Sequence, residues 1–213
     1  MTDLNQKHPA PATEQADWIA RWQRIARRIR VPLGFCTAAL YLFELSHRAP
    51  QMWAVAASLL LVVPGVALRG YAAGYVKKNR ELTVTGPYAR TRNPLYLGSM
   101  MIAAGFALAL LSWPMALLLA LGFTAIYVPV IASEERFLRT TFPGFDEYCG
   151  SVPRLLPRLT AARLPGADEQ AGSFSFSLYL RHREYNAAMG ATLLYASLLL
   201  LRPLLGHFFT GLH

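Results

Sequence analysis

The chain has 213 residues, of which 54% are hydrophobic and only 15% charged, with a formal net charge of +9. Its mean hydropathy is +0.29. An average globular chain is about 25% charged, so this apolar excess argues against a soluble domain, and the same numbers exclude the disordered, collagen-like and disulfide-rich classes. We expect an all-α, polytopic membrane protein.

The N-terminal 30 residues divide into two parts. Residues 1–17, rich in Pro, Ala and polar side chains, are typical of a disordered tail. In residues 18–30, Trp and Ile recur at spacings of three and four, with five arginines between them. That pattern fits either a basic amphipathic helix lying on anionic lipid or a cytosolic extension of the first membrane span.

Five apolar runs follow, each long enough, or nearly so, to cross a hydrocarbon core that needs about 20 helical residues. Lipid offers backbone groups no other partner, so we expect about five transmembrane helices. The runs are 31–46, 52–68, 95–111, 115–132 and 187–201. Together they define one transmembrane domain over 31–205, followed by a C-terminal tail, 206–213.

The basic residues predict the orientation of these helices. Of the 21 Lys and Arg residues, 19 lie in three segments, 1–30, 69–93 and 133–186, and only Arg48 and Arg202 lie elsewhere. The positive-inside rule then places the N-terminus in the cytoplasm and the C-terminus across the membrane, as expected for an integral protein of a bacterial-type inner membrane. The charge is explained by topology and anionic lipid headgroups, and without a recognition module we expect no nucleic-acid partner.

Several other site classes find no support in the sequence. Cys36 falls in an apolar run and Cys149 in a cytoplasmic segment, so we do not expect them to pair. The five histidines are scattered and no metal-ligand spacing is present, so we expect no metal. Neither a Gly-x-Gly-x-x-Gly nor a Walker loop occurs, which argues against a soluble nucleotide-binding domain.

The most informative stretch runs from Glu81 to Pro157. Asn93 followed by Pro94 predicts a helix start, and the turn at 112–114 predicts that the next helix returns antiparallel. Such a hairpin brings residues 90–96 and Glu134–Glu135 to the same cytoplasmic rim. Ionisable groups gathered at a membrane edge suggest a functional site. The equally weighted alternative is a set of ordinary interfacial salt bridges among Arg90, Arg92, Glu134 and Glu135.

Three motifs in this stretch carry a family resemblance. They read GPY-x-x-x-RNP-x-Y-x-G, EE-x-x-L-x-x-x-F and Y-x-x-x-VPR-x-x-P, within residues 65–160. In order and spacing the chain resembles the isoprenylcysteine carboxyl methyltransferase family, part of a wider group of integral-membrane methyltransferases that includes phospholipid N-methyltransferases. The resemblance implies S-adenosylmethionine as cofactor, and methyl transfer to a lipid or lipophilic acceptor that enters from the bilayer.

The resemblance also implies the residues that contact the cofactor. They are Arg80, Glu81, Leu82, Thr83, Tyr88, Asn93, Pro94, Leu95, Tyr96 and Glu134. The charged neighbours Arg92, Glu135 and Arg154 are our candidates for a catalytic role. Arg181 and Arg183, just before the last apolar run, are candidates for binding the substrate headgroup; the alternative is a snorkelling cluster that sets topology.

Two positions depart from the family pattern. Asn93 stands where the family usually has His, and it still donates and accepts hydrogen bonds. Val130 stands where the eukaryotic enzymes have an Arg that contacts substrate, four residues before Glu134. Recognition of a prenylcysteine carboxylate by that route is absent.

The implied cofactor suits these residue types. Carboxylates could meet its ammonium or ribose, arginines its carboxylate, and tyrosines its adenine or sulfonium. Methyl transfer is an in-line displacement that alignment alone can accelerate strongly. Two other classes stay open: an NADPH-dependent sterol or enone reductase, whose C-terminal region has similar motifs, and a non-catalytic membrane scaffold.

Overall fold

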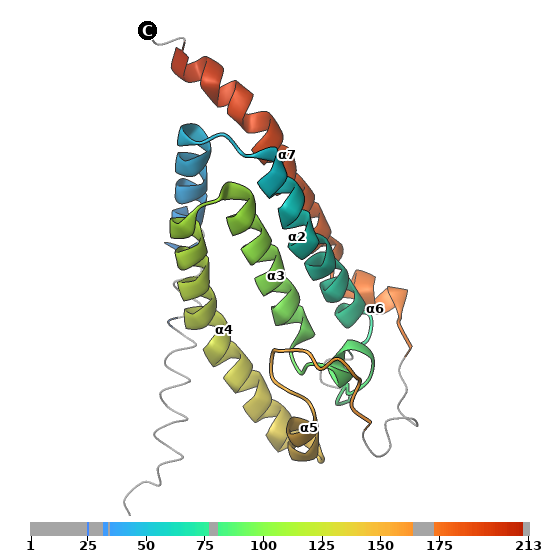
Figure 1. Ribbon diagram of the computed structural model, residues 1–213. Helices are drawn as coiled ribbons and strands as arrows, with labels where there is room; N and C mark the ends of the chain where they lie inside the picture. Colours follow the sequence, from blue (N-terminus) through green and yellow to red (C-terminus); the bar gives the residue numbers. More distant parts are fainter. Residues whose placement is uncertain (1–24, 26–31, 34, 77–80, 164–172, 211–213) are drawn as a thin grey trace, which may run out of the picture.

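The computed structural model describes residue 25 and residues 32–33, 35–76, 81–163 and 173–210, with side chains described as far as Leu201 (Figure 1). The predicted tail 1–17, nearly all of the basic segment 18–30, and Arg80 lie outside the described residues. Within the described part of the chain the regular structure is entirely helical. This confirms the expected all-α class.

Each of the five apolar runs forms a helix. The first is helical over 35–47, and the others correspond to α2 (Met52–Ala73), α3 (Pro94–Leu110), α4 (Trp113–Thr141) and α7 (Tyr185–Thr210). Three short elements connect them, η1 (Gly86–Ala89), α5 (Phe145–Ser151) and α6 (Phe176–Arg181). α7 continues past residue 205, where we expected a tail, because the apolar pattern resumes after Pro203.

The apolar side chains of these helices face outward. α2 and α4 are long and apolar enough to cross a membrane, yet only 28% and 22% of their most apolar windows are buried. α3 and the Tyr185–Leu201 part of α7 are shorter apolar helices. Leu60, Trp113 and Leu121 are all at least 60% exposed. A core helix of a soluble protein would bury such residues, so these surfaces are those of an integral membrane protein.

α4 is longer than the sequence pattern indicated. We expected the span to end near residue 132, but the helix continues through Glu134 and Glu135 to Thr141. The sequence SEERFLRT contains good helix formers, and the first breaker is the Pro143–Gly144 pair. Gly144 then turns the chain with φ of 85°, and α5 packs Phe145 and Tyr148 against the base of the bundle. This extension supplies one wall of the site.

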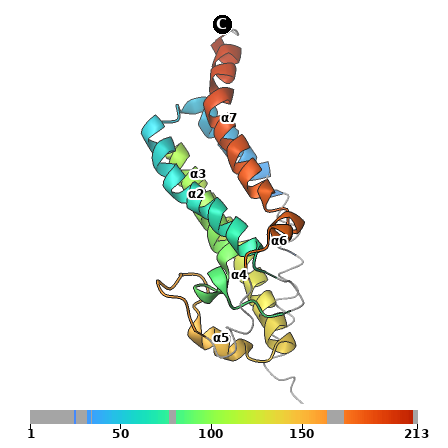
Figure 2. The same ribbon diagram turned by 90° about the vertical axis from the view of Figure 1, so that its right-hand side faces the viewer.

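α2 and α3 pack most closely, and two glycines allow it. A Cβ atom on Gly98 would lie 2.7 Å from the Gly65 carbonyl oxygen, and one on Gly65 would lie 2.8 Å from that of Gly98. Figures 1 and 2 both show the two helices side by side. The glycine that ends the first motif is therefore required by helix packing.

At the opposite end of the bundle, Ser112 joins three segments. Its Oγ accepts a hydrogen bond from the Met115 amide, which caps α4, and donates to Oε1 of Glu44 at 2.6 Å. Glu44, 5% exposed, also lies 3.6 Å from Arg48. This buried carboxylate thus anchors helix 35–47 to the α3–α4 turn.

Candidate functional site

Two segments far apart in the sequence pair at the lower end of the bundle. The Arg92 amide donates to the Pro153 carbonyl at 3.0 Å, and the Ala162 amide to the Ala89 carbonyl at 2.8 Å. Thr91 is fully buried and donates its hydroxyl to the Leu155 carbonyl at 3.1 Å. The first and third motifs therefore form one unit.

Asn93 is the N-cap residue of α3, as predicted, but its side chain belongs to this unit. It precedes α3, with Pro94 at the first helical position as predicted, but its side chain makes no capping hydrogen bond. Instead, its Nδ2 donates to the Arg154 carbonyl at 3.0 Å. The Asn93 side chain thus holds the third motif against the first, a contact that its helix-capping propensity could not predict.

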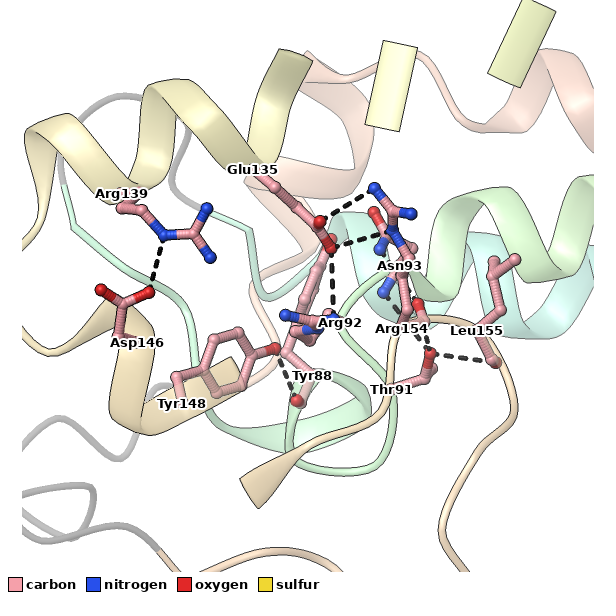
Figure 3. Close-up of polar contacts among 10 residues, drawn as sticks. All are labelled: Tyr88, Thr91, Arg92, Asn93, Glu135, Arg139, Asp146, Tyr148, Arg154 and Leu155. Atoms are coloured by element: carbon pink, nitrogen blue, oxygen red, sulfur yellow. Dashed lines mark hydrogen bonds and ion pairs between the residues drawn. The ribbon is translucent and has the colours of Figure 1, made fainter. Parts of the chain in front are cut away.

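Glu135 lies between two arginines, one from each segment (Figure 3). Arg92 approaches Oε1 at 3.4 Å, and Arg154 approaches Oε2 at 2.9 Å. The Arg92 and Glu135 side chains are 14% and 15% exposed, and Arg154 is 41% exposed. Two cations sharing one carboxylate leave one unit of positive charge at the site. The buried Nε of Arg92 has no hydrogen-bond partner within the part of the chain that the structure describes.

The hairpin also joins Tyr96 to Glu134. The Tyr96 hydroxyl donates to Oε1 of Glu134 at 2.9 Å, and the Tyr96 ring meets Tyr127 edge to face with centroids 5.0 Å apart. The expected meeting of residues 90–96 with Glu134–Glu135 is confirmed. The salt-bridge alternative is also partly realised, through Glu135, whereas Arg90 is exposed.

These residues surround a cavity of about 650 Å³, which we call the rim cavity. Of the predicted cofactor contacts, all except Arg80, which is not described, line it: Glu81, Leu82, Thr83, Tyr88, Asn93, Pro94, Leu95, Tyr96 and Glu134. Arg92 and Glu135 line it as well. Arg154 is not among the lining residues and reaches the cavity through Glu135.

The cavity has further walls that the sequence did not reveal. Arg69, on α2, makes hydrogen bonds to both carboxylate oxygens of Glu184 at 3.0 Å and donates to the Leu95 carbonyl at 3.2 Å. It also donates to the Ser99 hydroxyl. Tyr127, Tyr148 and Glu184 also line the cavity. Tyr148 begins the third motif, so its place in the site could have been inferred from that motif. The Arg69–Glu184 pair could not, because its residues are 115 apart in the sequence.

Two tyrosines in the cavity are held neutral. Burial raises the pKa of Tyr88 well above its usual range, and the neighbouring Tyr148 and Glu134 add to the effect. Burial likewise raises the pKa of Tyr148, while the Arg92 charge opposes it. The Tyr148 hydroxyl donates to the Tyr88 carbonyl at 2.8 Å. Both phenols therefore stay protonated beyond the pH at which an exposed tyrosine ionises.

Arg181 and Arg183 do not line the rim cavity. Arg181 ends α6, and Arg183 lies between α6 and α7 with φ of 54°. Both side chains are exposed. Glu184, the next residue, is the one from this cluster that reaches the cavity. If these two arginines bind the substrate headgroup, they do so outside the rim cavity.

The donor set fits S-adenosylmethionine in size and chemistry. A cavity of about 650 Å³ lies within the roughly 300–1,000 Å³ typical of ligand pockets. Glu81 and Glu134 offer carboxylates, Arg92 offers a guanidinium, and Tyr88 offers an aromatic ring. Among the described residues, no three His, Cys, Asp or Glu side chains gather closely enough to hold a metal ion.

Comparison with known proteins now gives the family. A phospholipid methyltransferase family model matches residues 51–144. The chain is 35% identical over 171 residues to the cobalt-zinc-cadmium resistance protein CzcN of Cupriavidus metallidurans, covering 76% of this chain and 78% of that protein. It is 37% identical over 117 residues to the nickel-cobalt-cadmium resistance protein NccN of Alcaligenes xylosoxydans xylosoxydans, covering 52% and 55%.

No solved structure matches the chain. The family match spans α2, α3 and α4 with the segments between them, and it includes most of the residues that line the rim cavity. It agrees with the motifs, which resemble integral-membrane methyltransferases that include the phospholipid N-methyltransferases. With CzcN aligned over most of both chains, the conclusion follows that this chain belongs to the phospholipid methyltransferase family.

Proposed function

We propose that the protein transfers a methyl group from S-adenosylmethionine to a lipid or lipophilic acceptor at the cytoplasmic rim of the membrane. The observation that carries the proposal is the rim cavity, whose lining brings the family motifs together with four carboxylates, two arginines and neutral aromatic rings. When bound, the cofactor supplies an electrophilic methyl group on a sulfonium.

The residues of the cavity have separable tasks in this proposal. Glu134, oriented by Tyr96, binds the ammonium or ribose. Arg92, held by Glu135, offers its guanidinium to a carboxylate. Catalysis then rests on alignment of the two reactants in a partly desolvated site.

An apolar groove provides the acceptor route. It encloses about 690 Å³ between α3 and α4, and we call it the α3–α4 groove. Tyr96 and Tyr127 line both this groove and the rim cavity, so the two spaces adjoin there. Met100, Ala104 and Phe123 give the groove an apolar wall suited to a hydrocarbon chain. The acceptor would lie in the groove with its reactive atom at Tyr96.

The apolar residue Val130 restricts the class of methyl acceptor that we expect. It lies one turn before Glu134 on α4, where the eukaryotic relatives have an Arg, and it is absent from the lining of both the cavity and the groove. A buried carboxylate without its cation costs several kcal/mol. We therefore expect weak or no methylation of farnesylcysteine analogues and preference for another amphiphile.

The direct test is methyl transfer with purified protein and tritiated cofactor. A total membrane lipid extract should accept label, and a farnesylcysteine analogue should accept little. Efficient turnover of the analogue would overturn the acceptor class, whereas no transfer to either would count against the activity. NADPH oxidation in the same preparation would favour the reductase class instead.

A cellular comparison can then identify the product. Lipid extracts of deletion and wild-type cells should differ by species separated by one methylene mass, about 14 daltons. The metal-resistance names of CzcN and NccN suggest making this comparison with and without cobalt or cadmium in the medium. A lipid methylated only in the wild type would name the acceptor.

A further inference from the structure

A second groove runs along α3 and adjoins the α3–α4 groove at Ala103, Leu119 and Phe123, which line both. It encloses about 1090 Å³, and we call it the α3–α7 groove. Its walls come from helix 35–47 through Tyr41, from α3 through Ile102, from α4 through Leu119, and from the first half of α7 through Ala187 and Gly190. Figure 2 shows α7 running beside the α2–α3 pair and set apart from it.

The two ends of this groove differ in chemistry. At one end the hydroxyls of Tyr41 and Ser197 meet at 2.5 Å, and a core cluster that includes Phe106 and Leu198 fills the space. At the other end the lining is polar, with His182, Arg183 and Asn186. The α3–α7 groove thus has one apolar end and, at the end nearer the rim cavity, a polar one.

The length of the α3–α7 groove matches one leaflet. It follows α3 from Ser99 to Leu110, and 11 steps of 1.5 Å give about 16 Å. Half of a hydrocarbon core of about 30 Å is about 15 Å. An acyl chain anchored at the polar end would therefore stay within its own leaflet.

The charge at the polar end favours an anion. Arg69 and Glu184 form a two-pronged ion pair that cancels their charges, and Nδ1 of His182 makes a hydrogen bond with the Ala73 carbonyl at 3.0 Å. The guanidinium of Arg183 is the remaining fixed charge among the described lining residues. The side-chain amide of Asn186 lines the same end of the groove.

We propose that the α3–α7 groove binds a membrane lipid with an anionic phosphate headgroup, its phosphate on Arg183 and one acyl chain along α3 and α7. The groove shares only Arg69 and Glu184 with the rim cavity among the residues that line them. The Arg69–Glu184 ion pair therefore stands between the headgroup end of this groove and the rim cavity, and we assign this lipid a site of its own, apart from the acceptor.

Arg181 offers a matched control. Both arginines are exposed and two residues apart, yet only Arg183 lines the groove. Purified protein in detergent should be stabilised against heat by added phosphatidylglycerol more than by phosphatidylcholine. Arg183→Gln should weaken phosphatidylglycerol binding about tenfold, as expected for one charge-assisted contact, and Arg181→Gln should leave it unchanged.

A second variant tests the acyl-chain part of the groove. A Cβ on Gly190 would meet nothing within 4 Å, so Gly190→Leu should fill the groove without disturbing the helix and should remove phosphatidylglycerol from the protein in native mass spectrometry. S-Adenosylhomocysteine affinity should not change in either variant, which separates this proposal from the proposed function. Equal effects of Arg183→Gln and Arg181→Gln, or equal stabilisation by soluble glycerol phosphate, would overturn it.

Discussion

The hydroxyl of Tyr96 donates a 2.9 Å hydrogen bond to Oε1 of Glu134, which joins the first turn of α3 to the C-terminal extension of α4. One residue further along α4, Glu135 lies between Arg92 and Arg154. The adjacent glutamates therefore have different partners. Glu134 lines the rim cavity and accepts a hydrogen bond from the neutral Tyr96 hydroxyl, whereas Glu135 forms ion pairs with both arginines.

This difference predicts that Glu135 matters for stability. Glu135→Gln would leave Arg92 and Arg154 without their shared carboxylate and should lower the free energy of unfolding by roughly 1–3 kcal/mol. Thermal or denaturant unfolding in detergent measures it. Asp146→Asn removes an equivalent carboxylate from an exposed pair, with Arg139, and should have a much smaller effect. Equal losses would show that Glu135 has no special structural role.

The α2–α3 contact predicts an intolerance at Gly98. A methyl group there would lie 2.7 Å from both the Gly65 carbonyl oxygen and Cγ of Arg69, so Gly98→Ala should cost about 1–3 kcal/mol of stability through overpacking. Gly150→Ala, where a Cβ meets nothing within 4 Å, serves as the control. A fully stable Gly98→Ala protein would mean that the two helices are further apart than described.

The buried tyrosines predict a loss of stability at alkaline pH. An unfolded tyrosine ionises near pH 10, whereas burial raises the pKa of Tyr88 and Tyr148 in the folded state. The unfolded state therefore binds fewer protons above pH 10, and stability should fall as pH rises beyond that point. Unfolding midpoints from pH 8 to 11 measure this fall, and Tyr88→Phe should reduce it. An unchanged slope in the variant would contradict the burial of Tyr88.

The distribution of basic residues predicts the topology. With 19 of 21 Lys and Arg residues in three segments, a reporter fused after Ala162 should be cytoplasmic and one after His213 should lie across the membrane. Protease or cysteine-labelling accessibility in intact cells reports each position. Both reporters on one side would mean that one apolar helix fails to span.

Much of this arrangement could be predicted from sequence, because it depends on local signals. Apolar runs gave the helices, and the matched lengths of the α3–α4 hairpin placed Tyr96 beside Glu134. The extension of α4 to Thr141 was missed because a hydropathy criterion ends at the first charges, although the residues after Ser133 favour a helix.

The remaining features depend on contacts that no local pattern encodes. The Arg69–Glu184 pair joins residues 115 apart, and its geometry depends on the absence of a side chain at Gly98. Asn93 was expected to cap α3, yet tertiary pairing directs its side chain to Arg154. Tertiary contact overrides propensity at both places.

Isothermal titration of S-adenosylhomocysteine into the detergent-purified protein tests the central claim most directly. Wild-type protein and Glu147→Gln, an exposed glutamate outside the rim cavity, should bind alike. Glu134→Gln should bind at least tenfold more weakly, since a charge-assisted contact is lost, and Tyr96→Phe should fall between them, with thermal unfolding showing that each variant is folded. No binding by the wild type, or unchanged affinity in a folded Glu134→Gln protein, would contradict the assignment of the rim cavity as the cofactor site.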